Sequence, residues 1–565
     1  MYTNFFEASN PTLLNGENGL MNLETRPRGR ARDRERERSK DCLFPVYNIT
    51  TEGPFFDLEE VMVAILHDSG CRDVEERKKD RRRRRSVSPP TSDEERERER
   101  EDEDSRHLMS RNAFLTGHSH TPDDLRRTQR ELELPRTVVL GTGFYGIPFS
   151  FETTRFPINL TSEAPTGFPD VVLRGRITVD GPRSYSGIRF SNVRYISRAS
   201  HKFYNCVFEE RFSLQHSNGK LLIDSCVFNL EESNRTLISL LGGEGEFIRC
   251  TFRVTRRLND CVALFHLAST SNCATIIRGC VFEIDLEEGT LDNLRRFFPI
   301  EIASSQPIIY DNNIAFIDPR GNNEVVFFGS CNNRQRIRLT VSGSKFVNRS
   351  ANSLLVALLG SLWGSAVADT NVNNVASLSS IYVTRCSLES VRPLFFGQDA
   401  CCHRESCSGG RLCSHCNQDL TDWTQSLLIT YTDILVNTPS NNIVTAAVDI
   451  TVPPQTRWTL SIINSTIVLN NLNIPISITT NDDVTINLSG TVFLGQGTVP
   501  VQIPGQTPGQ ILQPWIRVEG ASGLVTVITT GGTSTTNFGP PEIENPGGIV
   551  FRTGGVTLPN FNNGF

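Results

Sequence analysis

A short pattern of alternating apolar and polar residues around one small residue recurs along most of this chain. It is clearest in KLLIDSCVFNL, residues 220–230. Alternation with period two is typical of a half-buried strand. The first copies are 20, 24, 30 and 33 residues apart and are centred on Cys206, Cys226, Cys250, Cys280 and Asn313. A repeat with a minimum length that stretches freely predicts a solenoid whose coils carry loops of different lengths.

The later copies are centred on Ser344, Cys386, Asp433, Ser465 and Gly490. Each copy reads as two short strands bent at the small residue, with Phe, Leu or Ile two residues beyond the bend. Leucine-rich, TPR, ankyrin and HEAT repeats are excluded because their helical spacings are missing. The remaining prediction is an all-β parallel β-helix of about ten or more coils.

Stacked coils about 4.8 Å apart bury the faces that a single coil would expose. Equivalent side chains should then form rows along the axis. We predict an interior cysteine row made of Cys206, Cys226, Cys250, Cys280 and Cys386. We also predict an aromatic row made of Phe208, Phe228, Phe252, Phe282, Phe316, Phe346 and Phe493. Cysteine acts in such a row as a small hydrophobic residue.

Composition divides the 565 residues into three regions. Residues 1–134 are dominated by Arg, Glu and Asp, so we expect a largely disordered charged arm with a short helix near 56–68. Residues 135–497 carry the repeat and therefore the β-helix. Residues 498–565 are rich in Gly, Pro, Thr and Asn, and we expect a β cap that also makes an oligomer contact.

The repeat resembles that of right-handed parallel β-helix proteins of the pectin-lyase-like superfamily, over about residues 135 to 500. A resemblance of pattern specifies the fold better than the function. The superfamily includes polysaccharide lyases and hydrolases, phage tailspikes and viral capsid proteins. Among the last are the adenovirus-type β-helix capsid protein and a relative, the large adenoviral early transforming protein. The viral capsid and spike type is the nearest analogue, and it implies a homotrimer.

Enzymes of this superfamily use carboxylates on adjacent coils, and three aspartates are weak catalytic candidates. LNDCVALFH resembles the Asp-Asp-Cys segment of polygalacturonases, but Asn259 replaces the first carboxylate and leaves only Asp260. Asp482 and Asp483 stand at a strand entry, where Asp commonly serves a turn. The family's Gly-His-Gly is missing, so we predict a protein that is not an enzyme. A site assembled from distant coils or across subunits stays open.

An insert at residues 398–418 breaks the repeat and is rich in Cys and His. Thiolate and imidazole groups at such short spacing suit tetrahedral Zn²⁺, which could order a loop that has no core of its own. The alternatives are reactive or disulfide-linked cysteines, or a merely Cys-rich surface loop. For a structural zinc site the candidate ligands are Cys402, His403, Cys407, Cys413, His415 and Cys416.

The arm contains a cationic block that could be read by a nuclear importer or contact nucleic-acid phosphates. The following Arg-Glu repeats nearly cancel its field beyond one Debye length of about 8 Å. We therefore expect weak nucleic-acid contact at most, and a solvated, self-compensating tail is the third alternative. The block consists of Arg81, Arg82, Arg83, Arg84 and Arg85.

These features favour a viral structural protein, a capsid-associated or surface-spike β-helix whose arm anchors it or directs it to the nucleus.

The first residues show no secretory signal, so the fifteen cysteines should be reduced. The apolar stretch 353–368 is too short to span a membrane and should be buried strand. Expected partners are two further copies and other virion proteins, in the virion and in the host nucleus during assembly. Two alternatives are a nuclear regulatory binding protein of the adenoviral early-protein type and a polysaccharide lyase or hydrolase on the same fold.

Overall fold

The structure is a computed structural model, and the account below concerns only the part of the chain that it describes. That part comprises residues 46–49, 61, 136–147, 152, 157–163, 170–230, 236–254, 263–269, 272–286, 296–304, 306–319, 324–329, 337–349, 356–360, 378–390, 392–396, 423–436, 446–451, 456–470, 473–479, 483–495, 499–501, 509–511, 513–519, 523–543 and 549–554.

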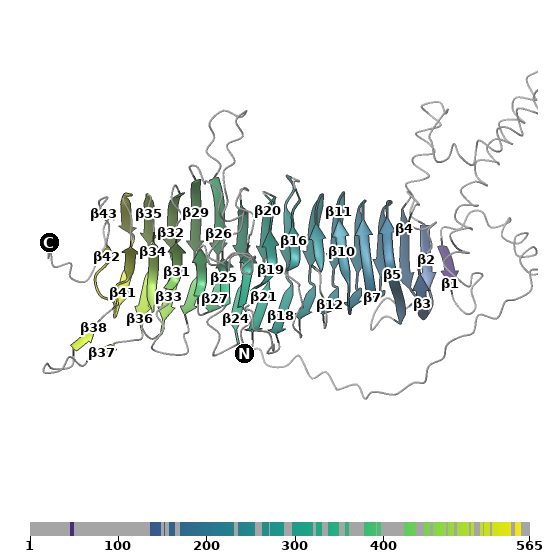
Figure 1. The fold of residues 1–565 in the computed structure, drawn as a ribbon, viewed down its shortest axis with the longest axis horizontal. Helices are drawn as coiled ribbons and strands as arrows, with labels where there is room; N and C mark the ends of the chain where they lie inside the picture. Colours follow the sequence, from purple (N-terminus) through teal and green to yellow (C-terminus); the bar gives the residue numbers. More distant parts are fainter. Residues whose placement is uncertain are drawn as a thin grey trace, which may run out of the picture. The chain divides into compact units, whose positions relative to one another are not determined.

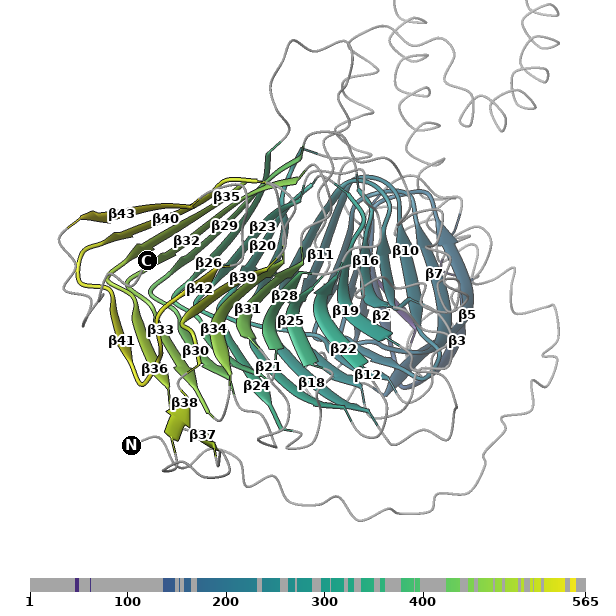
Figure 2. The ribbon, with the colours of Figure 1, turned by 60° about the vertical axis from the view of Figure 1, so that its left-hand side comes forward.

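Nearly all of this backbone is β-strand, and the strands stack in parallel as rows along one axis (Figures 1 and 2). One row is a 16-stranded sheet, called sheet A here. A 25-stranded sheet, sheet B, supplies two more rows, B1 and B2. A typical coil contributes one strand to A, one to B1 and one to B2 before the chain returns to A. The fold is therefore all-β and consistent with the predicted parallel β-helix.

Sheet A consists, in order, of β1 (Val46–Ile49), β2 (Arg136–Leu140), β4 (Ile158–Ser162), β6 (Arg183–Ser186), β8 (His201–Tyr204), β11 (Lys220–Asp224), β14 (Glu244–Ile248), β17 (Thr275–Arg278), β20 (Pro307–Asp311), β23 (Arg338–Ser342), β26 (Leu378–Thr384), β29 (Trp423–Thr430), β32 (Thr456–Ile463), β35 (Val484–Ser489), β40 (Val525–Thr530) and β43 (Ile549–Gly554). Row B1 consists of β9 (Val207–Glu209), β12 (Val227–Leu230), β15 (Thr251–Val254), β18 (Val281–Leu286), β21 (Ile314–Pro319), β24 (Lys345–Asn348), β27 (Ser387–Ser390), β30 (Asp433–Val436), β33 (Thr466–Leu469), β36 (Val492–Gly495) and β41 (Ser534–Thr536). Row B2 consists of β10 (Ser213–His216), β13 (Ile238–Leu240), β16 (Ala263–Leu267), β19 (Arg296–Ile302), β22 (Glu324–Gly329), β25 (Val356–Gly360), β28 (Arg392–Phe396), β31 (Ala446–Thr451), β34 (Ile474–Thr479), β39 (Ile516–Glu519) and β42 (Glu542–Ile543). Sheet B begins with β3 (Gly143–Gly146), β5 (Val171–Val179) and β7 (Arg189–Ser197), and a separate antiparallel pair is formed by β37 (Val499–Val501) and β38 (Gly509–Ile511).

The bend between sheet A and row B1 is made by one residue with positive φ. Ser225 (φ 56°), Arg249 (φ 53°) and Gly343 (φ 55°) occupy this place in three of the coils. The left-handed conformation turns the chain sharply and directs the next side chain inward. At Gly343 a β-carbon would lie 2.3 Å from Oδ1 of Asn312, so any other residue at this bend would have to displace the Asn312 side chain.

The residues after these bends form the predicted interior row. Cys206, Cys226, Cys250, Cys280 and Cys386 are all buried and follow one another on the coils, with polar residues interspersed. Two later copies of the pattern are offset by one residue from the cysteine copies: Asp433 is exposed, and Gly490, with a φ of 58°, lies at the bend itself. The interior positions of these two coils belong to the neighbouring buried residues Thr432 and Thr491.

The aromatic row is confirmed over four coils and then interrupted. Phe208, Phe228, Phe252 and Phe282 are paired in register, with successive ring centroids 4.4, 4.6 and 4.9 Å apart. The next position belongs to Ala315, which pairs with Phe282. Phe316 lies on the outer face instead, under the guanidinium of Arg349 at 3.9 Å, so its place in the predicted row was wrong. The row includes Phe346 and Phe493 farther along, both buried.

Described strands extend on both sides of the region predicted to carry the β-helix. β1 comes from the segment predicted to be a disordered arm, yet it pairs in parallel with β2. Sheet A also continues through β40 and β43, inside the region predicted as a cap. Val61, the one described residue of the predicted helix, has helical backbone and a buried side chain.

The apolar stretch 353–368 was predicted to be strand rather than membrane span. Its described part, β25, is strand and pairs with β22 and β28. In the described portion of the chain, no helix combines the length and the apolar character that crossing a membrane would need.

Candidate functional site

Most of the residues predicted to be catalytic, metal-binding or nuclear-targeting lie outside the described residues. They are Asp260, Asp482, the proposed zinc ligands Cys402, His403, Cys407, Cys413, His415 and Cys416, and the basic block Arg81 to Arg85. The structure therefore does not test the predicted zinc site or the predicted nuclear-targeting segment. Within the ranges given above, no group of three or more His, Cys, Asp and Glu side chains could hold a metal ion.

Asp483 is described, and its contacts are those of a structural residue. Its side chain Oδ1 accepts a hydrogen bond from the backbone N–H of Leu524 at 2.9 Å, and its carbonyl accepts one from Trp458 at 3.2 Å. These contacts join neighbouring coils at the start of β35. Asp483 thus holds a strand entry, which is the alternative to catalysis that the sequence allowed.

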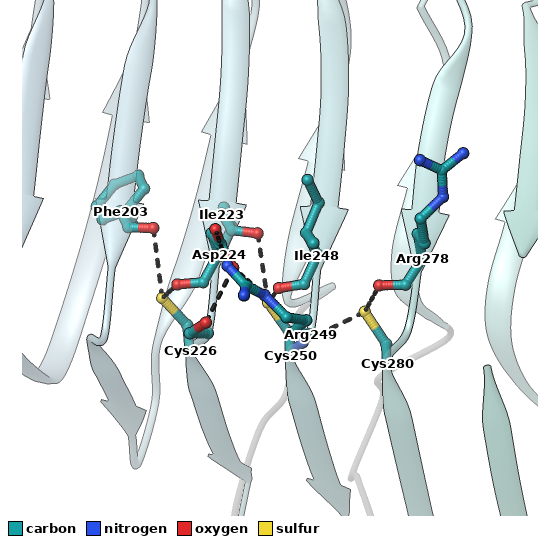
Figure 3. Close-up of polar contacts among 10 residues, drawn as sticks. Phe203, Ile223, Asp224, Cys226, Ile248, Arg249, Cys250, Arg278 and Cys280 are labelled. Atoms are coloured by element: carbon teal, nitrogen blue, oxygen red, sulfur yellow. Dashed lines mark hydrogen bonds and ion pairs between the residues drawn. The ribbon is translucent and has the colours of Figure 1, made fainter. Parts of the chain in front are cut away.

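The most regular polar arrangement is the interior row that contains the cysteines, which we call the thiol ladder (Figure 3). The Sγ atoms of Cys226 and Cys280 each accept the backbone N–H of the cysteine one coil earlier, at 3.4 Å. The Sγ of Cys250 lies 3.4 Å from the carbonyl oxygen of Ile223 and 3.3 Å from that of Ile248. The thiols thus add hydrogen bonds to backbone groups around each bend.

Polar residues continue the thiol ladder where cysteine is absent. Oδ1 of Asn313 accepts the N–H of Cys280 at 2.7 Å, and Nδ2 of Asn313 donates to the carbonyl of Ile277 at 2.9 Å. The N–H of Asn313 in turn donates to Oγ of Ser344 at 3.1 Å. Cys, Asn, Ser and Thr are therefore equivalent here as small side chains that can both donate and accept.

The thiols of the ladder are all buried. Burial raises the pKa of Cys226 and of Cys280, and it raises the pKa of Cys386 to about 11. Because the thiolate is the nucleophile and the metal ligand, these three thiols are poorly reactive. At Cys250 burial acts in the same direction, but hydrogen bonds with Cys226 and Cys280 outweigh it and lower the pKa, so the protection of this thiol from reagents rests on its burial alone.

The burial of these thiols predicts the pattern of alkylation by iodoacetamide. In the native protein, peptides containing Cys206, Cys226, Cys250 and Cys280 should stay unmodified at pH 8, and the exposed Cys273 should react. Mass spectrometry of the peptides after alkylation with and without denaturant measures this. Native labelling of any ladder cysteine at the rate of Cys273 would contradict the assignment.

Charged residues join the coils on the outer surface beside the ladder. Nη2 of Arg249 lies 2.6 Å from a carboxylate oxygen of Asp224, and Nε of Arg278 lies 3.1 Å from one of Asp311 (Figure 3 labels the first pair). Asp311 also accepts a hydrogen bond from Ser342 at 2.7 Å. These bonds each bridge two successive coils. Exposed ion pairs contribute little energy each, so their chief effect is to fix the register.

A second buried polar group lies among the first coils. The hydroxyls of Tyr185 and Tyr195 are 2.7 Å apart, and the hydroxyl of Tyr195 is also 2.7 Å from Nδ1 of His201. On the next coil Nδ1 of His216 contacts the hydroxyl of Ser197 at 2.8 Å. Burial lowers the pKa of both histidines and raises that of both tyrosines. All four side chains are therefore neutral near pH 7, as the core requires.

The outer face of row B2 carries one acid–base pair that sequence inspection did not find. Nδ1 of His266 on β16 is 2.8 Å from Oε2 of Glu301 on β19. Their side chains are 30% and 13% exposed, so both can meet solvent. Ser239 is the register partner of His266 on the preceding coil, but no described hydrogen bond joins the two. A carboxylate thus orients an imidazole, as in catalytic sites, but no described nucleophile is hydrogen-bonded to that imidazole.

The pair predicts a specific pH dependence of stability. The hydrogen bond to Glu301 raises the pKa of His266 above its usual value of about 6.5. A raised pKa means that the pair stabilises the fold fully below about pH 6.5 and that this contribution is lost as the pH rises through the raised pKa. His266→Gln should therefore lower the thermal midpoint at pH 6 and change it little at pH 9. An equal loss at both values would contradict an ionic role.

Comparison of the chain with protein-family models, with curated proteins and with solved structures gives no match.

Proposed function

We propose that the chain is a non-enzymatic structural protein of a viral particle, either associated with the capsid or forming a surface spike. The observation that supports this most is the continuous parallel register of sheet A from β1 to β43. Successive coils are joined by backbone bonds and interior rows, and some of them also by outer ion pairs. Such a solenoid is stiff along its axis, which suits a load-bearing component. The buried ladder inside it fits a structural role as well.

The finer parts of the proposal rest on the resemblance given above. We place the chain with right-handed β-helices of the pectin-lyase-like type, of about ten or more coils, assembled as a homotrimer with other virion proteins. The arm with Arg81 to Arg85 would direct it to the host nucleus during assembly or make weak nucleic-acid contact. The insert at 398–418 would be ordered by structural zinc.

Quantitative mass spectrometry of purified particles tests the structural role. A structural component should be present in fixed stoichiometry to the major capsid protein and should remain after the particles are washed in high salt. Abundance in producing cells with no recovery from particles would contradict the proposal. That outcome would instead favour the regulatory binding protein.

The His266–Glu301 pair is the one observation that favours the alternative of a polysaccharide lyase or hydrolase. The full chain should release neither reducing ends nor unsaturated products from anionic polysaccharides. Product formation that disappears in Glu301→Gln would overturn the non-enzymatic assignment. Glu283→Gln is a matched control because Glu283 is an exposed carboxylate paired with Arg253.

A further inference from the structure

Three exposed arginines lie on the first coils of sheet B. Arg176 on β5 and Arg194 on β7 are register partners, and both side chains are exposed. Arg174 lies two residues before Arg176 and is also exposed. We call these three residues the arginine patch. Adjacent strands are about 4.8 Å apart, so the first two cations are held close together.

No described carboxylate contacts any residue of the arginine patch. Other arginines on the outer surface of the coils do have such partners: Arg249 with Asp224, Arg253 with Glu283, Arg278 with Asp311, and Arg517 with Glu542. Like charges directly opposite each other on adjacent strands destabilise a sheet. The arginine patch therefore carries a repulsion between like charges that the four paired arginines avoid. A ligand of opposite charge would remove this repulsion.

Asp170, just before β5, is exposed, whereas four other acidic side chains near the patch in the sequence have partners of their own. Glu152 accepts a hydrogen bond from the backbone N–H of Thr178 at 3.0 Å. Asp180 pairs with Arg198 at 3.4 Å, and Glu209 lies 3.8 Å from Arg189. Glu210 accepts a hydrogen bond from Ser191 at 2.9 Å. Rearrangement of these carboxylates toward the patch would break existing contacts. These carboxylates are therefore not free to neutralise the patch.

The local backbone opens the patch to solvent. The register between β5 and β7 shifts between Leu173 and Gly175, which marks a bulge. Gly175 has a φ of 99°, and nothing lies within 4 Å of where its β-carbon would be. Bulges commonly re-aim side chains near functional sites. Here the bulge leaves the residues from Arg174 to Arg176 exposed in succession.

We propose that the arginine patch binds a sulfated polysaccharide. Guanidinium groups bind tetrahedral oxyanions through paired hydrogen bonds, and two arginines on adjacent coils could hold successive sulfate groups. Ser213, the register partner of Arg194, and the exposed Asn192 supply hydrogen-bonding groups for sugar hydroxyls. This inference rests on the charge and geometry of the patch and does not require the proposed structural role.

The surroundings favour a sulfated glycan over a nucleic acid. Proteins that bind single-stranded nucleic acid combine a basic groove with several aromatic rings on which bases stack. Among the described residues, the exposed aromatic neighbour of the patch is Phe144, which is 70% exposed. The guanidinium of Arg174 already lies 4.5 Å from the centre of that ring. The described residues therefore offer no platform on which successive bases could stack.

Binding of the full chain to a heparin fragment tests the proposal. All variants should carry glutamine in place of Arg81 to Arg85, so that the arm contributes equally. The double variant Arg176→Gln/Arg194→Gln should bind heparin about tenfold more weakly, and the dependence of log Kd on log salt should fall by about 2. The matched control Arg253→Gln/Arg278→Gln removes the same charge from paired positions and should bind within about twofold of the parent chain.

Further probes separate the classes of ligand. Fully desulfated heparin, which keeps its carboxylates, should not bind. Equal binding by the patch and control variants, or full binding of desulfated heparin, would overturn the proposal. So would tighter binding of oligo(dT) of matched charge that is lost in the patch variant, since that result assigns the patch to nucleic acid. The thermal midpoint of the patch variant should equal or exceed that of the parent, because the substitution relieves repulsion.

Discussion

Replacement of Phe252 by alanine is expected to lower the free energy of unfolding of its coils by about 3–5 kcal/mol. Its ring is fully buried between those of Phe228 and Phe282, with centroids 4.6 and 4.9 Å away. The ring of Phe265 closes the site from another side at 5.0 Å. Neighbouring coils are fixed by their own backbone bonds, so they cannot collapse into the space that the ring leaves. The free energy of unfolding should therefore fall by the full cost of the cavity.

Hydrogen exchange of amides in β12, β15 and β18 is the suitable measurement, because a long solenoid need not unfold as one unit. The matched control is Phe316→Ala. Phe316 is outside the aromatic row beside Arg349, so its removal should cost only about 0.5–1 kcal/mol. If both substitutions destabilised the protein equally, the distinction between the inner and outer faces would be wrong.

Replacement of Asn313 by leucine should destabilise the protein by about 2–5 kcal/mol, whereas replacement by cysteine should cost about 1 kcal/mol. Leucine fills the site but leaves the N–H of Cys280 and the carbonyl of Ile277 without their partners. Two buried backbone groups would then lose hydrogen bonds that water cannot replace. Cysteine restores weaker versions of both bonds, as Cys280 does for the N–H of Cys250 and the carbonyl of Phe247.

Thermal midpoints and amide exchange at β17 and β20 measure this comparison. The native protein should have the highest thermal midpoint, Asn313→Cys a slightly lower one, and Asn313→Leu one well below both. A leucine variant as stable as the cysteine variant would show that the thiol ladder acts by volume alone. Its polar contacts would then have no energetic role.

The sequence was sufficient to predict the stacking of coils because the repeat reflects local geometry. A residue that accepts positive φ, a small inward residue and an apolar residue two positions later recur together, as in Asn205, Cys206 and Phe208. Which residue points inward is harder to predict from the sequence where all the neighbouring residues are apolar. In IAFI, Phe316 has the larger side chain, yet Ala315 points inward because it lies two residues after Asn313.

The candidate sites on the surface could not be predicted in the same way. His266 and Glu301 are 35 residues apart, and only the register of β16 with β19 brings them together. Arg176 and Arg194 likewise become neighbours through the pairing of β5 with β7. These registers depend on the lengths of the intervening loops, and the loop lengths follow no fixed period. The arginines of the N-terminal arm form a continuous run that is visible in the sequence, whereas the residues of the arginine patch are dispersed along it.

A structure of the full chain by crystallography or electron cryomicroscopy at side-chain resolution tests the central claim most directly. The account predicts that Phe208, Phe228, Phe252 and Phe282 form one column with ring centroids 4.4, 4.6 and 4.9 Å apart, on strands in parallel register. Phe316 should lie outside that column, against Arg349. A sandwich of antiparallel strands, or a parallel fold in which these four rings belong to strands that are not neighbours, would contradict it.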